Sequence, residues 1–175
     1  MPGHDSSAVP DGDAAAGAPH LIQSFANTLS AGSGADLLST REQAADWLRE
    51  AALLPEGAGL TGSEQGALLR LRDSLRDVLA AHTDGRDNAD AHARLTRALA
   101  DGRLVLTVDR ASTVRLASAA RASYSSVVAS VAVAVAESAA SGAWLRLKSC
   151  TAAGCGLAFL DGSVTCDVRY CPAHA

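Results

Sequence analysis

The segment TGSEQGALLRLRDSLRDVLAAH, residues 61–82, has the spacing of one long amphipathic helix. Its apolar residues recur at steps of three and four, and they are Leu68, Leu71, Leu75, Val78 and Leu79. Thr61 and Glu64 stand three residues apart, which is the pattern of a capping box at a helix start. The opposite face carries Arg72, Asp73, Arg76 and Asp77, and its mixed charge predicts a solvated surface. His82 is expected to cap the end of this helix.

Further helical patterns flank this segment. Residues 39–54, STREQAADWLREAALL, begin with a capping-box pattern at Ser39 and Glu42 and place Trp47 on an apolar face, where a core position is expected. Short helices are predicted over residues 21–29 and 91–100. A buried Ala/Ser/Val-rich helix is predicted to follow residue 122 and to end near Gly142.

Residues 103–116 change the period. Leu104, Leu106 and Val108 alternate with Val105 and Thr107, and a turn-like stretch separates them from a second short run. This pattern predicts a two-stranded hairpin that packs on the helices, because an isolated hairpin is only marginally stable. The expected fold class is therefore mainly α with a small β-hairpin: a helical domain over residues 20–143, followed by a small C-terminal module.

Composition excludes several functions. Aromatic residues make up 3% of the 175 residues, so a single-strand binder built on stacked rings is not expected. A formal charge of −4 means that any contact with DNA needs a local basic patch. Residues 1–19 are interpreted as a disordered leader without the features of a secretory signal, which favours a cytoplasmic protein. The apolar run at 122–136 is too short to span a membrane.

All four cysteines lie in the last twenty-six residues. Cys150 and Cys155 form one pair, Cys166 and Cys171 form a second, and His174 stands close to the end. Thiolate and imidazole ligands suit zinc, and two short pairs can fix a tetrahedral site without a large core. Five candidate ligands compete for four positions. A structural zinc is favoured, while disulfides, buried unligated thiols and a reactive thiol remain alternatives.

The C-terminal residues resemble the zinc finger of bacterial CGNR proteins. The first part of that finger, Arg-Leu-Lys-x-Cys, is matched by Arg146, Leu147, Lys148 and Cys150, and its second cysteine is matched by Cys155. Its Phe-x-Asp-x-Ser segment is matched by Phe159, Asp161 and Ser163. Its basic and aromatic residues before the next cysteine are matched by Arg169, Tyr170 and Cys171. The FANT stretch at residues 25–28 is similar to an element near the start of that family's mainly helical domain. The resemblance, over roughly residues 20–171, implies a stress-induced transcription regulator with a finger that touches DNA.

The sequence departs from the family at its name-giving motif. Cys-Gly-Asn-Arg is absent, and the last residues read CPAHA. We therefore expect His174 to complete a site of Cys150, Cys155 and Cys171, with Cys166 as the alternative fourth ligand. A fourth position filled by water or substrate would be the catalytic pattern.

Three functions follow from these observations. The first is a zinc-binding, regulator-like protein whose finger contacts DNA or a protein partner, with Lys148 and Arg169 as contact residues and a homodimer as one arrangement. The second is a zinc-dependent enzyme with an open metal position, which is less favoured because no general base is visible near the thiols. The third is a small-molecule-binding helical domain with a structural zinc. Asn27 and Asp161 are the candidate pocket residues.

Overall fold

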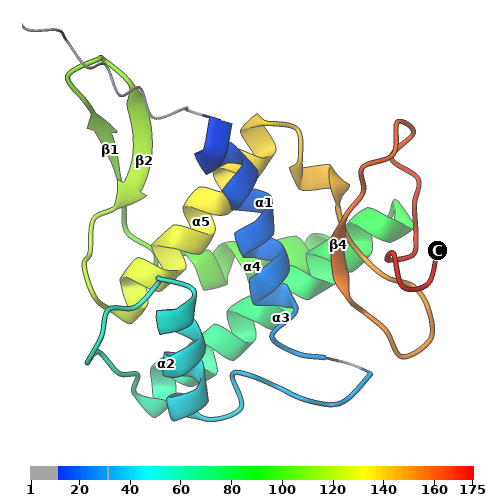
Figure 1. Ribbon diagram of the computed structural model, residues 1–175, viewed down its shortest axis with the longest axis horizontal. Helices are drawn as coiled ribbons and strands as arrows, with labels where there is room; N and C mark the ends of the chain where they lie inside the picture. Colours follow the sequence, from blue (N-terminus) through cyan, green and yellow to red (C-terminus); the bar gives the residue numbers. More distant parts are fainter. Residues whose placement is uncertain (1–11, 31) are drawn as a thin grey trace, which may run out of the picture.

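A computed structural model describes residues 12–30 and 32–175 and confirms the mainly helical prediction (Figure 1). The helices are α1 (Gly12–Ala26), α2 (Arg41–Glu50), α3 (Gly62–Asp84), α4 (Ala89–Leu99), α5 (Tyr124–Ala140) and the 3₁₀ helix η1 (Trp144–Arg146). The strands are β1 (Leu104–Val108), β2 (Val114–Ser118), β3 (Leu147–Ser149) and β4 (Ala158–Leu160). In the described part of the chain, no helix has both the length and the apolar content needed to cross a membrane.

Helix α3 forms the base on which α1, α4 and the C-terminal module pack. Its predicted capping box is confirmed: the Thr61 hydroxyl accepts from the Glu64 N–H, and the Glu64 carboxylate accepts from the Thr61 N–H. All five leucine and valine residues of the predicted apolar stripe are buried. The polar face is not uniformly solvated, because Arg72 is buried and its Nη1 lies 2.6 Å from the Asp36 carboxylate. A long-range ion pair removes this cation from solvent.

Two predicted helix starts need correction. Helix α1 begins at Gly12, so residues 12–19 are helical rather than part of a disordered leader; residues 1–11 lie outside the described residues. Alanine-rich sequence ahead of Pro19 favours the helix.

Helix α2 is capped by Thr40, whose hydroxyl accepts from the Gln43 N–H, and not by the predicted Ser39. The Ser39 hydroxyl instead bonds the Gln43 side chain.

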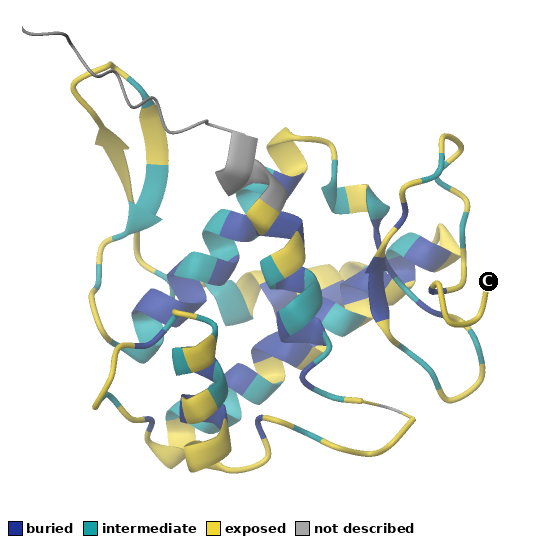
Figure 2. Cartoon of the chain, in the orientation of Figure 1, coloured by how far each residue is buried: buried dark blue, intermediate teal, exposed yellow. Residues whose placement is uncertain are grey.

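The predicted hairpin is present, but it extends away from the helices (Figure 1). Strands β1 and β2 pair antiparallel with Leu106 opposite Leu116. Only the second half of β2 is half-buried, where it lies against α5, whereas β1 is exposed along its whole length (Figure 2). The expectation that the hairpin packs on the helices therefore holds for one strand only.

The C-terminal module, residues 144–175, packs on the far end of α3 and on the end of α1 (Figure 1). Strands β3 and β4 form a second short hairpin, with Lys148 opposite Phe159. Leu147 and Ala158 extend the main core into the module, while Cys150, Phe159 and Cys171 form a separate small cluster. The module is thus joined to the helical part by a shared core.

Candidate metal centre

Two turns bring the metal-ligand candidates together. Cys150 follows β3 directly, and its N–H donates to the Leu157 carbonyl across the hairpin at 2.8 Å. The connecting loop turns back through Gly154 and Gly156, whose φ angles of 74° and 58° favour glycine. This turn returns the chain to β4 and leaves Cys155 on the same side as Cys150.

The second turn supplies the remaining ligands. The His174 N–H donates to the Cys171 carbonyl at 2.8 Å, which folds the imidazole back over the Cys171 thiol. The Thr151 N–H donates to the Arg169 carbonyl, so the two turns are held side by side. Residues distant in sequence therefore converge because backbone hydrogen bonds fix both loops.

The resulting cluster has the dimensions of a tetrahedral metal site. The ligand atoms of Cys150, Cys155, Cys171 and His174 all lie within 4.8 Å of one another. The Cys155 and Cys171 sulfurs are 3.9 Å apart, and the His174 Nδ1 lies 3.3 Å from the Cys171 sulfur and 3.7 Å from the Cys150 sulfur. A zinc ion with Zn–S bonds of about 2.3 Å separates tetrahedral sulfurs by about 3.8 Å. These residues could hold a metal ion, and their three sulfurs and one imidazole suit zinc.

The environment affects the thiols unequally. Burial opposes ionisation of Cys150, but N–H groups of Cys171 and Ala152, together with the neighbouring thiols, outweigh it and lower the pKa of Cys150 to about 7. Burial, together with the neighbouring thiols of Cys150 and Cys171, raises the pKa of Cys155. A group that releases its proton near neutral pH is a favourable starting point for metal binding, since the thiolate is the ligand.

Cys166 lies outside this cluster. Its sulfur is 3.9 Å from the Leu145 carbonyl oxygen, its carbonyl accepts from Lys148, and its backbone has a left-handed φ of 53°. All four cysteines are free thiols, so no pair of them is joined in a disulfide. The geometry therefore groups His174, and not Cys166, with the other three candidates.

Lys148 is part of the interior of the module. Its side chain and that of Asp161 are 4% and 0% exposed, and the ammonium lies 2.8 Å from the Asp161 carboxylate. Lys148 also donates to the Cys166 carbonyl at 2.7 Å and the Val168 carbonyl at 3.2 Å. Burial acts to raise the pKa of Asp161, but the bonds from Lys148, Ser163 and Val168 outweigh burial and hold this pKa well below its usual range. Neither residue is available for the predicted contact or pocket role, because each satisfies the buried charge of the other.

The other two cations of the module are engaged as well. Arg146 donates through Nη1 to the Asp161 and Ser163 carbonyls at 3.1 and 2.6 Å. Arg169 remains half-exposed, and its guanidinium bonds the Asp84 carboxylate and the Thr83 carbonyl at the end of α3. The arginine predicted to contact DNA thus ties the module to the helical part.

Other residues at this junction hold the module in place. The Asn27 amide donates to the Ala158 carbonyl at 2.9 Å and accepts from the Ala158 N–H at 2.7 Å, so it pairs with β4 instead of lining a pocket. The Thr83 hydroxyl accepts from the Ser149 N–H at 2.8 Å. Spacing alone gives no signal for these pairs, because their partners lie 66 to 131 residues apart.

His82 also differs from its predicted role as a helix cap. Its Nδ1 lies 2.9 Å from the Leu147 carbonyl oxygen, and because a carbonyl only accepts, Nδ1 carries the proton. The ring packs edge-on against Trp144 with centroids 5.0 Å apart. Burial lowers the pKa of His82, which favours this neutral form. His82 therefore links α3 to the start of the module.

Comparison with known families assigns the helical part of the chain. Residues 19–142, more than two thirds of the 175 residues, match a family described as "Putative stress-induced transcription regulator". The chain belongs to this family, ABATE. The resemblance noted in the sequence is thereby confirmed. No curated protein matches the chain.

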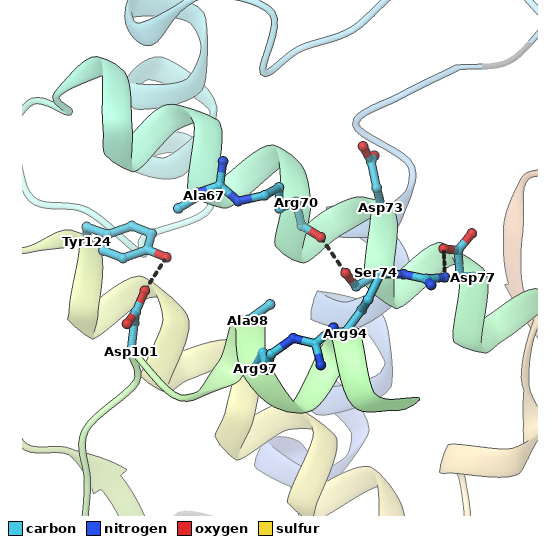
Figure 3. Close-up of a pocket in the computed structure, with 10 residues that line it drawn as sticks. All are labelled: Ala67, Arg70, Asp73, Ser74, Asp77, Arg94, Arg97, Ala98, Asp101 and Tyr124. Atoms are coloured by element: carbon cyan, nitrogen blue, oxygen red, sulfur yellow. Dashed lines mark hydrogen bonds and ion pairs between the residues drawn. The ribbon is translucent and has the colours of Figure 1, made fainter. Parts of the chain in front are cut away.

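The surface of this ABATE protein has a groove beside the cluster and another between two helices. One, of about 300 Å³, runs beside the cluster between Ser30, Leu157 and His174. The other, of about 470 Å³, lies between α3 and α4 (Figure 3). Two contacts cross this groove: Arg94 bonds Asp77 at 2.7 Å, and the Tyr124 hydroxyl donates to Asp101 at 3.1 Å.

Proposed function

We propose that this protein is a zinc-binding regulator of the ABATE family whose Cys150, Cys155, Cys171 and His174 site is structural. In this proposal the metal closes the C-terminal module, and the module contacts a protein partner instead of neutralising DNA phosphates. The observation that carries the proposal is that all three basic side chains of the module, Arg146, Lys148 and Arg169, already serve internal bonds.

A structural zinc accounts for how so small a module folds. Its own apolar cluster contains only three buried residues, two of which are the candidate ligands Cys150 and Cys171. A core of this size supplies little stabilisation, whereas zinc bound by thiolates and imidazole contributes folding free energy directly. Four protein ligands fill the tetrahedral positions, and this supports a closed site over the open position that a catalytic zinc requires.

Contact with a protein suits the exposed surface of the module. The large apolar side chains that remain exposed there are those of Leu145, Leu157, Leu160, Val164 and Tyr170. Phosphate contact depends on lysine and arginine. A surface with apolar and aromatic side chains and internally used cations resembles a protein interface more than a nucleic-acid interface.

Metal content tests the structural site. We expect one zinc per chain in the wild type, and a cobalt-substituted spectrum with three thiolate ligands. His174→Ala should lose or weaken the metal, while Cys166→Ser should retain it, and His92→Ala is a matched control at an exposed histidine of α4. Chelation should unfold residues 144–175 but leave most of the helical circular dichroism. Wild-type protein without metal, or metal loss confined to Cys166→Ser, would remove the basis of the proposal.

Gel retardation with duplex DNA over a range of salt concentrations tests the nature of the partner. We expect no salt-dependent retardation of the wild-type chain. Retardation that disappears in Arg169→Gln would show phosphate contact by the module and contradict the proposal. Retardation that disappears in Arg110→Gln, at the tip of the other hairpin, would equally contradict it by moving nucleic-acid contact to β1 and β2. Arg86→Gln, at an exposed position beyond α3, is the control for a general loss of charge.

A further inference from the structure

The β1–β2 hairpin exposes an apolar face, most of which no segment among residues 12–30 and 32–175 covers. Alternation places five apolar side chains on one face: Leu104, Leu106, Val108, Val114 and Leu116. Leu106, Val108 and Val114 are 70%, 66% and 59% exposed. Figure 2 shows β1 exposed throughout, in contrast to the buried faces of the nearby helices. A two-stranded hairpin with this exposure is marginal, and additional strands would stabilise it.

In the described part of the chain, the edge of β1 that faces away from β2 has no paired strand, and it is suited to pairing. The Asp109 N–H donates to the Thr113 carbonyl, and the Ala119 N–H donates to the Arg103 carbonyl. In an antiparallel pair of strands, the backbone groups of every second residue bond to the neighbouring strand. Because residues 103 and 109 bond to β2, the backbone groups of Val105 and Thr107 also face β2. The N–H and C=O groups of alternate residues, 104, 106 and 108, therefore point to the open edge.

This edge lacks the features that normally prevent association. Proteins protect edge strands with charged side chains, proline or bulges. Residues 104–108 read LVLTV and contain none of these, and every residue of β1 has a partner in a regular register with β2. Strand β2 is less accessible, because its second half lies against α5.

We propose that β1 pairs antiparallel with β1 of a second copy of this chain, about a two-fold axis at Leu106. The two hairpins then form one four-stranded sheet. In this register Leu104 lies opposite the partner's Val108, and Leu106 lies opposite the partner's Leu106. The N–H and C=O groups of residues 104, 106 and 108 that point away from β2 then all bond to the partner strand, because this register sets these three positions opposite the same three positions of the partner.

Charge at the ends of the strand selects this partner. The same register places Arg103 beside the partner's Asp109, twice in the dimer, so opposite charges meet at both ends of the paired strands. Asp109 is ionised at neutral pH at its ordinary pKa, and N–H groups of Thr113 and Ala111 lower that pKa further. Within residues 12–30 and 32–175, no carboxylate pairs with the Arg103 side chain. A parallel arrangement would instead place Arg103 beside the partner's Arg103 and Asp109 beside the partner's Asp109, so like charges would repel at both ends.

The proposal is tested on the full chain by sedimentation or light scattering over about a hundredfold range of protein concentration. We expect a monomer–dimer equilibrium for the wild type. Leu106→Pro removes an outward N–H at the two-fold axis without removing a bond to β2, so it should raise the dimer dissociation constant by at least about tenfold. Leu106→Val keeps the N–H and an apolar strand-forming side chain, and it should remain dimeric.

A charge variant tests the register. Asp109→Asn keeps the oxygen that accepts from the Ala111 and Thr113 N–H groups, so the turn is preserved while the charge is lost. We expect weaker dimerisation and a smaller dependence on salt than in the wild type. A wild-type chain that stays monomeric at the highest concentration would overturn the proposal, as would a Leu106→Pro variant that dimerises like the wild type. Unchanged helical circular dichroism in each variant excludes unfolding of the helical part as the cause.

Discussion

Replacing Lys148 with methionine should destabilise the C-terminal module far more than an ordinary surface mutation. Methionine keeps the length of the side chain and removes the ammonium. In the wild type this group donates to the Asp161 carboxylate and to the carbonyls of Cys166 and Val168. The change leaves a carboxylate and two carbonyl oxygens buried without that donor.

The expected loss follows from burial. Breaking a buried ion pair by removing one partner costs about 3–5 kcal/mol, because the remaining charge keeps its desolvation penalty. Asp161 retains two N–H donors, from Ser163 at 2.9 Å and Val168 at 3.0 Å, which limits the loss to the lower part of this range. Replacing both Lys148 and Asp161 with methionine and leucine removes the orphaned charge and should recover only part of the stability, because the Ser163 and Val168 N–H groups then lose their acceptor.

The dependence on pH gives a second signature. In the wild type the pKa of Asp161 lies below its usual range, so its contribution is present above about pH 3.9 and is lost as the pH falls through the folded-state value. Without Lys148 the pKa of Asp161 should be higher than in the wild type, because one of the bonds that oppose the effect of burial is lost. The variant then regains stability relative to the wild type as the pH falls, and the difference should be largest at neutral pH.

Urea unfolding, followed by tryptophan fluorescence and circular dichroism, measures this loss. Arg94→Met is the matched control, because its pair with Asp77 has side chains 44% and 50% exposed and should contribute at most about 1 kcal/mol. If Lys148→Met destabilised the protein no more than Arg94→Met, the assigned role of the buried pair would be refuted.

Two further predictions concern contacts within the helical part and at the junction. Burial lowers the pKa of His82 in the folded chain. Below about pH 6.5 the unfolded chain therefore binds a proton at this residue more readily than the folded chain does, and the free energy of unfolding decreases as the pH is lowered. His82→Gln keeps a donor for the Leu147 carbonyl, and its unfolding free energy should fall less between pH 7.5 and 5.5; equal slopes would contradict the assignment. Gly102→Ala should lower the free energy of unfolding by about 1–3 kcal/mol, because the new Cβ would lie 2.8 Å from the Ala129 backbone nitrogen. Gly62→Ala is the control: its new Cβ meets nothing within 4 Å, so the free energy of unfolding should not change.

Local patterns in the sequence were sufficient for the helical architecture. The apolar stripe from Leu68 to Leu79 and the capping box at Thr61 predicted α3, because both signals arise within a few turns of one helix. The alternation at residues 104–108 predicted the hairpin for the same reason. The start of α1 could not be placed, since the helix continues through the Ala-rich region into a segment with no periodic apolar face.

Sequence spacing also identified the candidate ligands as a set of five, but the choice of four depended on tertiary structure. Cys166 lies closer in sequence to Cys171 than Cys150 does, yet the Lys148–Asp161 ion pair and the two turns direct His174 into the cluster and leave Cys166 outside it. By composition the module is weakly basic, with Arg146, Lys148 and Arg169 against Asp161 and Asp167. Only the fold showed that its three cations are used internally, because each partner comes from a distant segment.

The sequence by itself thus determined the helices, the hairpin and the identity of the thiol and imidazole groups, because each depends on residues that are neighbours along the chain. Tertiary structure alone decided which groups meet and which remain exposed. It buried Lys148 and paired Asn27 with β4, and among the described residues it left β1 exposed along its length. These outcomes depend on contacts between segments far apart in sequence, whose geometry is fixed only when the cores pack.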